Sequence, residues 1–208
     1  MPQDAIPGPG RSHSGAPHSR AIRKRGLAGR LDSLRGFDLG VYSILAVTHP
    51  SANVPVIQVS IRSDYDPAAH LELGRALRRL RNEGILIVGS GSSSNPLDPG
   101  DAVAGSRAFD AWLVNAVVDL PPVQRRRCLL DWKRAPYARI AHPREDHLMP
   151  LLVVVGAAEN EPGQVIYRED GPKSLSSYRF GNSVASTDTV GLLPSISTSK
   201  IEAQETAE

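Results

Sequence analysis

The stretch 141–151 holds the densest set of side chains able to bind a metal ion or move a proton. Within six residues it contains His142, Glu145, Asp146 and His147. Imidazole and carboxylate groups together are a donor set that transition metals accept. However, two histidines five residues apart differ by about 140° around a helix axis, which argues against joint coordination from one helix. A helix start, with acidic residues beside the positive end of its dipole, is the other interpretation, and both stay open on these residues.

A loop rich in glycine and serine, Gly89–Asp98, follows an apolar segment that is typical of a buried strand. Open α/β sheets bind ligands beyond the carboxyl ends of their strands, so this loop is a candidate site. Ser94 replaces the third glycine of a dinucleotide-binding fingerprint, and no Gly-Lys-Ser/Thr follows. The Gly-x-Ser-x-Gly pattern of a serine nucleophile is also absent from the chain. We therefore expect neither a nucleotide site nor a serine hydrolase.

The hydrophobic pattern predicts an α/β fold with a mainly parallel central sheet flanked by helices. Residues 54–61 and 85–88 are apolar on both faces, as expected of buried strands. Between them the spacing predicts a helix that begins at Pro67, after an N-capping aspartate, and ends at Gly84. These three elements would form a βαβ unit with a parallel pair of strands.

Later elements follow the same patterns. We predict a helix over 106–120, a short helix over 124–132, a helix or strand over 147–158, and paired strands over 164–168 and 177–180. Four residues that could do chemistry are interpreted as structural or exposed instead. They are Asp38 in a turn, His49 in a loop, His70 in the first turn of a helix, and Cys128 in the core.

Charge divides the 208 residues into three parts. The whole chain has 24 Lys and Arg against 22 Asp and Glu, yet residues 1–30 hold six basic residues and one acidic residue. We predict a disordered basic arm over 1–34, the α/β domain over 35–180, and a flexible tail over 181–208. The arm has no apolar run after its basic cluster, so it is not a secretory signal, although a mitochondrial or nuclear address remains an alternative.

Composition excludes several classes of protein. The charged fraction of 22% argues against an integral membrane protein, and one cysteine excludes a disulfide scaffold or a zinc site built mainly from thiolates. Aromatic residues make up only 5% of the chain, which argues against modules that stack on RNA bases. We expect a cytoplasmic protein with no membrane partner and no nucleic-acid partner.

Seven segments, in their order along the chain, together resemble the class III extradiol ring-opening dioxygenases, in the branch that includes DOPA dioxygenase. They are residues 35–40, 53–60, 70–74, 83–91, 109–113, 142–151 and 156–158. The resemblance implies an incomplete version of that family's α/β fold, with non-haem Fe(2+) or Zn(2+) at the carboxyl ends of the strands. It also implies a catechol-type substrate and O2.

The resemblance implies roles for two histidines of this chain, whereas other histidines of the family have no match in it. His147 matches the family's C-terminal metal ligand, and His142, a frequent neighbour, is the candidate catalytic acid or base. In contrast, Leu39 and Asn95 stand where the family carries histidines. Two further metal histidines of the family lie in an N-terminal part that residues 1–34 do not match.

Three functions therefore remain open. The chain is a family enzyme that inserts O2 into a catechol-type ring, if side chains such as His49 or His70 complete the metal site. Alternatively it is a catalytically inactive relative, or a truncated product, that lacks most metal ligands. A third alternative is a binding protein that uses the basic arm on nucleic acid or an acidic partner, with affinity that falls steeply with salt.

Overall fold

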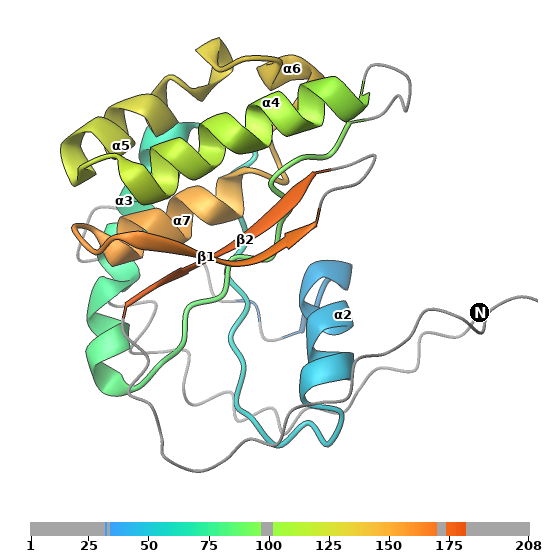
Figure 1. Cartoon of the computed structure of the whole chain (residues 1–208). Coiled ribbons are helices and arrows are strands. Elements are labelled where there is room, and N and C mark those ends of the chain that lie inside the picture. Colours follow the sequence, from blue (N-terminus) through green and yellow to red (C-terminus); the bar gives the residue numbers. More distant parts are fainter. Residues whose placement is uncertain (1–31, 33, 97–101, 170–173, 182–208) are drawn as a thin grey trace, which may run out of the picture.

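The computed structural model describes residues 32, 34–96, 102–169 and 174–181, and Figure 1 shows their arrangement. The helices in chain order are α2 (Leu39–Thr48), α3 (Pro67–Leu77), η1 (Arg78–Glu83), α4 (Ala102–Val114), η2 (Asn115–Asp119), α5 (Pro122–Leu130), η3 (Trp132–Arg134), α6 (Ala138–Ala141) and α7 (Met149–Ala158). Two strands follow, β1 (Gly163–Glu169) and β2 (Leu175–Phe180). None of the helices in the described parts is long and apolar enough to cross a membrane.

Helices α3 and α7 pack directly on one another because glycine faces glycine where they cross. A Cβ added at Gly74 would lie 2.0 Å from the carbonyl oxygen of Val153, and one added at Gly156 would lie 2.1 Å from that of Leu71. Any larger side chain would force the helices apart. This contact fixes α7, and with it the chain that enters α7 from the His142–His147 stretch.

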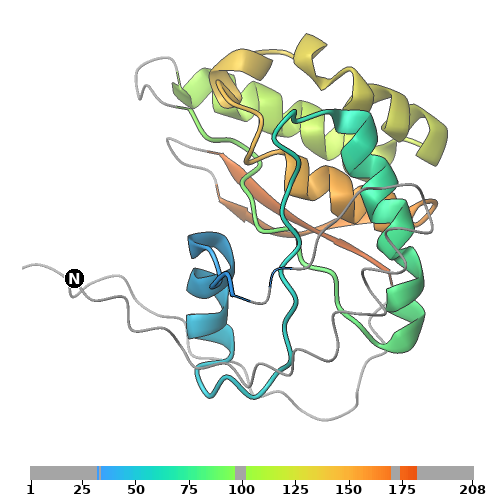
Figure 2. The same ribbon diagram turned by 180° about the vertical axis from the view of Figure 1, so that it is seen from behind.

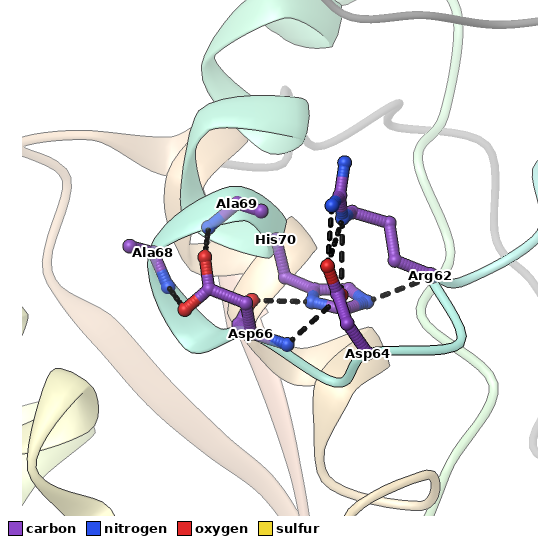
Figure 3. A network of polar contacts seen from close by, with 6 residues as sticks. All are labelled: Arg62, Asp64, Asp66, Ala68, Ala69 and His70. Carbon is purple, nitrogen blue, oxygen red and sulfur yellow. Dashed lines mark hydrogen bonds and ion pairs between the residues drawn. The ribbon is translucent and has the colours of Figure 1, made fainter.

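The start of α3 is held by a network of polar contacts, shown in Figure 3. The Asp66 carboxylate caps the helix by accepting from the backbone N–H groups of Ala68 and Ala69. His70 is buried, and its Nε2 accepts from the backbone N–H of Arg62 while its Nδ1 donates to the carbonyl oxygen of Asp66. Both ring nitrogens are used, so the prediction that His70 is structural is confirmed.

The main core lies between α4, α5, α7 and the hairpin. Large side chains with essentially no exposure meet there, among them Phe109, Leu113, Trp132, Met149 and Leu152. Strands β1 and β2 form an antiparallel pair, with Gly163 opposite Phe180, and cover one side of this core. The predictions of helices near 67, 106 and 124 and of two late paired strands are confirmed, and the segment 147–158, for which helix and strand were both open, forms the helix α7.

The mainly parallel sheet, by contrast, is not confirmed. Within the described residues the only sheet is the antiparallel pair β1–β2. Residues 54–61 and 85–88 are extended, as Figures 1 and 2 show, but no backbone hydrogen bond joins them. A strand pattern specifies a strand only when a partner supplies the ladder, and these two segments have none in the part of the chain that the structure describes.

Helix α2 stands apart from the helical layer in both views (Figures 1 and 2). It has no counterpart among the sequence predictions, and Asp38, predicted to lie in a turn, is its N-cap and accepts from the N–H of Val41.

No residue of 34–61 or 84–92 is buried. We call these two ranges the open half, and the other described residues from 62 to 181 the packed half.

Most of the predicted arm and tail lies outside the described residues. Of residues 1–34 the structure describes Asp32 and Leu34, and of 181–208 it describes Gly181. The domain boundaries therefore stay predictions.

Candidate functional site

The glycine–serine loop, residues 89–95, brings together the segments that the sequence singled out. The hydroxyl of Ser90 donates to the carbonyl oxygen of Gly40, 2.9 Å away, and so joins the loop to the start of α2. The N–H of Ser92 donates to the carbonyl oxygen of His147 at 3.0 Å. A Cβ on Gly91 would lie only 2.3 Å from that same oxygen, so the loop needs glycine there.

A hollow of about 1000 Å³ opens beside this loop. Its histidine end is lined by the serines of the loop, by exposed His147, and by the apolar side chains of Leu151 and Val154. Its arginine end is lined by residues 84–88, by Arg78, Arg81 and Glu161, and by the end of β2. Apolar walls with a few converging polar groups are typical of sites for small molecules.

His142 lies beneath the loop rather than in the hollow. Its side chain is 0% exposed, and its Nε2 donates to the carbonyl oxygen of Ser93 at 3.0 Å. Phe109 and Trp132 meet the imidazole edge-on, with ring centroids 5.1 and 5.9 Å from it. Burial lowers the pKa of His142 to about 4, so the ring is neutral at pH 7. A catalytic role for His142 stays a prediction; in this geometry it holds the loop in place.

Asp110 anchors the same loop from α4, a role that was not predicted from the sequence. Its carboxylate is 0% exposed and accepts from the hydroxyls of Ser93 at 3.4 Å and Ser176 at 3.0 Å. The Ser93 hydroxyl oxygen in turn accepts from the N–H of Ser176 at 2.8 Å. The available signal was a carboxylate inside the apolar run 109–113, a position where burial requires partners.

Nearby, burial raises the pKa of the Tyr178 hydroxyl, and the adjacent Asp110 carboxylate adds to the effect. Tyr178 therefore stays protonated and neutral at physiological pH. It lines the hollow next to Arg179. Any polar group that Tyr178 offers to a ligand is a hydroxyl, not a phenolate.

The ligand set for iron or zinc is incomplete among the described residues. No three His, Cys, Asp or Glu side chains come together there in a way that could hold a metal ion. Leu39 is 78% exposed and offers no donor, and Asn95 is tied to the carbonyl oxygen of Ala141 through its backbone N–H at 2.7 Å. His70 cannot substitute because both its nitrogens are used, and His49 lies exposed beside Thr48. The implied metal does not fit this set.

A family model and several named relatives that are similar to this chain point to the same family. The family model described as the catalytic LigB subunit of aromatic ring-opening dioxygenase matches residues 21–183. A 4,5-DOPA dioxygenase extradiol of Beta vulgaris is 37% identical over 157 residues, which cover 72% of this chain and 58% of the relative. The enzyme of the same name from Mirabilis jalapa is 32% identical over 177 residues, covering 80% of this chain and 65% of the relative.

One further relative and one solved structure are also similar to this chain. The dioxygenase tasH of Hapsidospora irregularis is 38% identical over 160 residues, covering 68% of this chain and 48% of that protein. The crystal structure of an uncharacterized protein from Escherichia coli K12 superposes with a TM-score of 0.73 at 26% identity, covering 87% of this chain and 77% of that one.

The match is partial in length. This chain spans 58% and 65% of the two plant relatives. All seven segments on which the resemblance rests fall inside the family match, and three of them, 35–40, 83–91 and 142–151, are joined at the glycine–serine loop by hydrogen bonds from Ser90 to Gly40 and from Ser92 to His147. The chain has an α/β fold and belongs to the family of the catalytic LigB subunit of aromatic ring-opening dioxygenases.

Proposed function

We propose that this chain binds a catechol-type aromatic ring at the histidine end of the hollow and does not open the ring by itself. The shape and chemistry of that end support binding. Leu151 and Val154 supply apolar walls, and His147 supplies a polar group for a diol. The serine hydroxyls of the loop donate within the chain, so toward a diol they act as acceptors. Relatives named for DOPA, itself a catechol, support the substrate class.

The observation that carries the proposal is the incomplete ligand set around His147. Protein sites that hold zinc or iron tightly use three or four ligands, and His147 has no group of His, Cys, Asp or Glu partners among the described residues. Without a metal, triplet O2 reacts only slowly with a catechol. The residues of this site can therefore bind and orient a ring but cannot activate O2 beside it.

A second candidate is ring opening by O2 at Fe(2+) or Zn(2+), as the sequence analysis first stated. The family match favours it, because it covers most of the chain and the named relatives are dioxygenases. It requires metal ligands from outside the described residues, where His13 and His18 lie. A role for residues 1–34 in binding nucleic acid or an acidic partner also stays a prediction.

Three measurements on the purified full chain separate these functions. Elemental analysis after anaerobic loading with ferrous iron, and separately with zinc, gives the metal content per folded chain. Equilibrium dialysis measures catechol binding, and an oxygen electrode measures catechol-dependent O2 uptake. We expect catechol binding, no retained metal and no O2 uptake.

The variant His147→Ala tests the site itself, with His49→Ala as the matched control on an exposed histidine. We expect catechol affinity to fall about tenfold in the first variant and to stay unchanged in the second. Absence of catechol binding in the unmodified chain overturns the proposal. Catechol-dependent O2 uptake by iron-loaded chain, with about one metal retained, establishes the second candidate instead.

A further inference from the structure

Two chain edges that have no strand partner among the described residues border the arginine end of the hollow. One is the extended segment 85–88, and the other is the free edge of β2, which pairs with β1 along one side only. The two edges come together where the N–H of Ser176 reaches the hydroxyl oxygen of Ser93. Unpaired edges that share one hollow are a place where an extended segment can add as a strand.

The segment 85–88 already has the alternation of a strand. Ile85 and Ile87 pack against the small core cluster of α3 and η1, whereas Leu86 and Val88 are 83% and 61% exposed. The N–H of Ile85 donates to the carbonyl oxygen of Leu80, but within the described residues no hydrogen bond reaches the backbone of 86–88. This edge offers both unpaired backbone groups and uncovered apolar side chains.

The described chain ends at this same place. Gly181 follows β2 directly and adopts φ +89°, the left-handed conformation in which glycine turns a chain back on itself. A Cβ on Gly181 would lie 2.7 Å from Arg81 Nη2 and 3.1 Å from Glu161 Oε2, and both of these residues line the hollow. The next 27 residues, 182–208, thus start at the rim of the arginine end.

The two ends of the chain differ in charge, and this difference indicates which of them suits the arginine end of the hollow. Three arginines, Arg78, Arg81 and Arg179, line the hollow. Arg78 pairs with Glu159 and Arg81 pairs with Glu161. Residues 182–208 carry four acidic residues and one lysine, whereas residues 1–30 carry six basic residues and one acidic residue. These three arginines and two glutamates leave a formal excess of one positive charge, which favours the acidic tail over the basic arm as the occupant.

Within the tail, one short stretch has the pattern of a strand. Val190 and Leu192 alternate with Thr189 and Gly191, a second leucine follows at 193, and Pro194 then prevents the ladder from continuing. The connection 182–188 can reach about 25 Å, and a four-residue edge such as 85–88 is about 13 Å long. The connection is long enough for the stretch to return along the edge.

We propose that residues 189–193 of this chain add as a third strand at the arginine end of the hollow, antiparallel to β2 and beside 85–88. Val190 and Leu192 then cover Leu86 and Val88, and the acidic end of the tail lies near the arginines. The strand leaves the histidine end, with His147, accessible to a ring. Failure of this proposal is therefore distinct from failure of catechol binding.

Hydrogen–deuterium exchange of the full chain, read by mass spectrometry over residues 85–89, tests the added strand. We expect the amides of 86–88 to exchange about tenfold or more slowly than an unstructured peptide of the same sequence. The full-length double variant Val190→Asp/Leu192→Asp is expected to abolish that protection. The double variant Ile196→Asp/Ile201→Asp is the matched control, because it places the same two charges in the tail outside the proposed strand, and it should retain protection.

Each other outcome overturns the proposal. Amides of 86–88 that exchange at the unstructured rate in the unmodified chain show that nothing covers this edge. Protection that survives the double variant shows that another segment covers it. Protection that increases with protein concentration assigns the edge to a second copy of the chain.

Discussion

The two halves of the molecule contain similar apolar side chains but use them differently. All of the buried hydrophobic residues lie in the packed half, whereas the open half exposes large apolar side chains throughout. Leu113 on α4 is 0% exposed and Leu86 in the open half is 83% exposed. The difference is not hydrophobicity but the presence of a second layer, because a strand or helix buries its apolar face only against another element.

The first way to test this comparison is to truncate a leucine in each half. Leu113→Ala is expected to lower the free energy of unfolding by about 2–5 kcal/mol, since it removes buried methyl groups and leaves a cavity. Leu86→Ala is expected to change it by less than about 0.5 kcal/mol. Urea denaturation followed by far-UV circular dichroism measures both. Equal losses would show that Leu86 is buried in solution and that the halves do not differ.

The second test uses the buried imidazole of the packed half. Burial lowers the pKa of His142 to about 4, while an unfolded histidine titrates near 6.5. Between these values the unfolded chain binds a proton that the folded chain does not. The free energy of unfolding should therefore fall by about 3 kcal/mol as pH drops from 6.5 to 4, and His142 should contribute no pH dependence above that window.

The variant His142→Gln isolates this effect, because glutamine keeps an N–H donor for the Ser93 carbonyl but does not titrate. Denaturant titrations across the same pH range should show a smaller loss in the variant than in the unmodified chain. Near-UV circular dichroism at neutral pH checks that the Trp132 environment is retained. Identical pH profiles for the two proteins would exclude a buried, neutral His142.

The third test compares two glycines. Gly74→Ala places a methyl group against the backbone of α7 and is expected to cost about 1–3 kcal/mol of stability. Gly36→Ala is the control in the open half, where no atom lies within 4 Å of the added Cβ, and should have little effect. Thermal unfolding measures both variants. A Gly74→Ala protein as stable as the unmodified chain would contradict the close crossing of α3 and α7.

The smallest expected effect comes from the two helix caps. Asp66→Ala removes the cap of α3, whose next turns are buried, and is expected to cost about 1 kcal/mol in global unfolding. Asp38→Ala removes the equivalent cap of α2, which has no buried residue, and should loosen that helix without changing global stability. Denaturation reports the first effect, and amide exchange over 39–48 reports the second. A global loss from Asp38→Ala would place α2 within the cooperative core.

Local sequence patterns predicted the structure correctly where it depends on the residues of one element alone. The aspartate cap with Pro67 located the start of α3, and the positive φ of Gly84 confirms its predicted role at the end of η1. The late strands were found because β1 and β2 pair with each other. In contrast, the strand predictions for 54–61 and 85–88 depended on ladder partners, and no local pattern reports whether partners are present.

The site shows the same limit. The sequence marked the 35–40, 89–98 and 141–151 stretches separately, and only the structure shows that hydrogen bonds from Ser90 to Gly40 and from Ser92 to His147 join them. The burial of His142 and the role of Asp110 were not predictable, because both follow from how α4 and the hairpin close over the loop. Helix α2 was not predicted for a similar reason. It has a single cap and buries no apolar face, so its sequence lacks the pattern of a packed helix.

The bond between Ser93 and Ser176 spans 83 residues, and this separation has a consequence for synthesis. A chain emerging from the ribosome completes the glycine–serine loop long before the hairpin that fastens it exists. Contacts between such distant residues also form late because closing a long loop costs chain entropy. The newly made loop therefore lacks this hydrogen bond until β2 has been synthesised, so a chain that ended before residue 176 would lack the bond that fixes the loop.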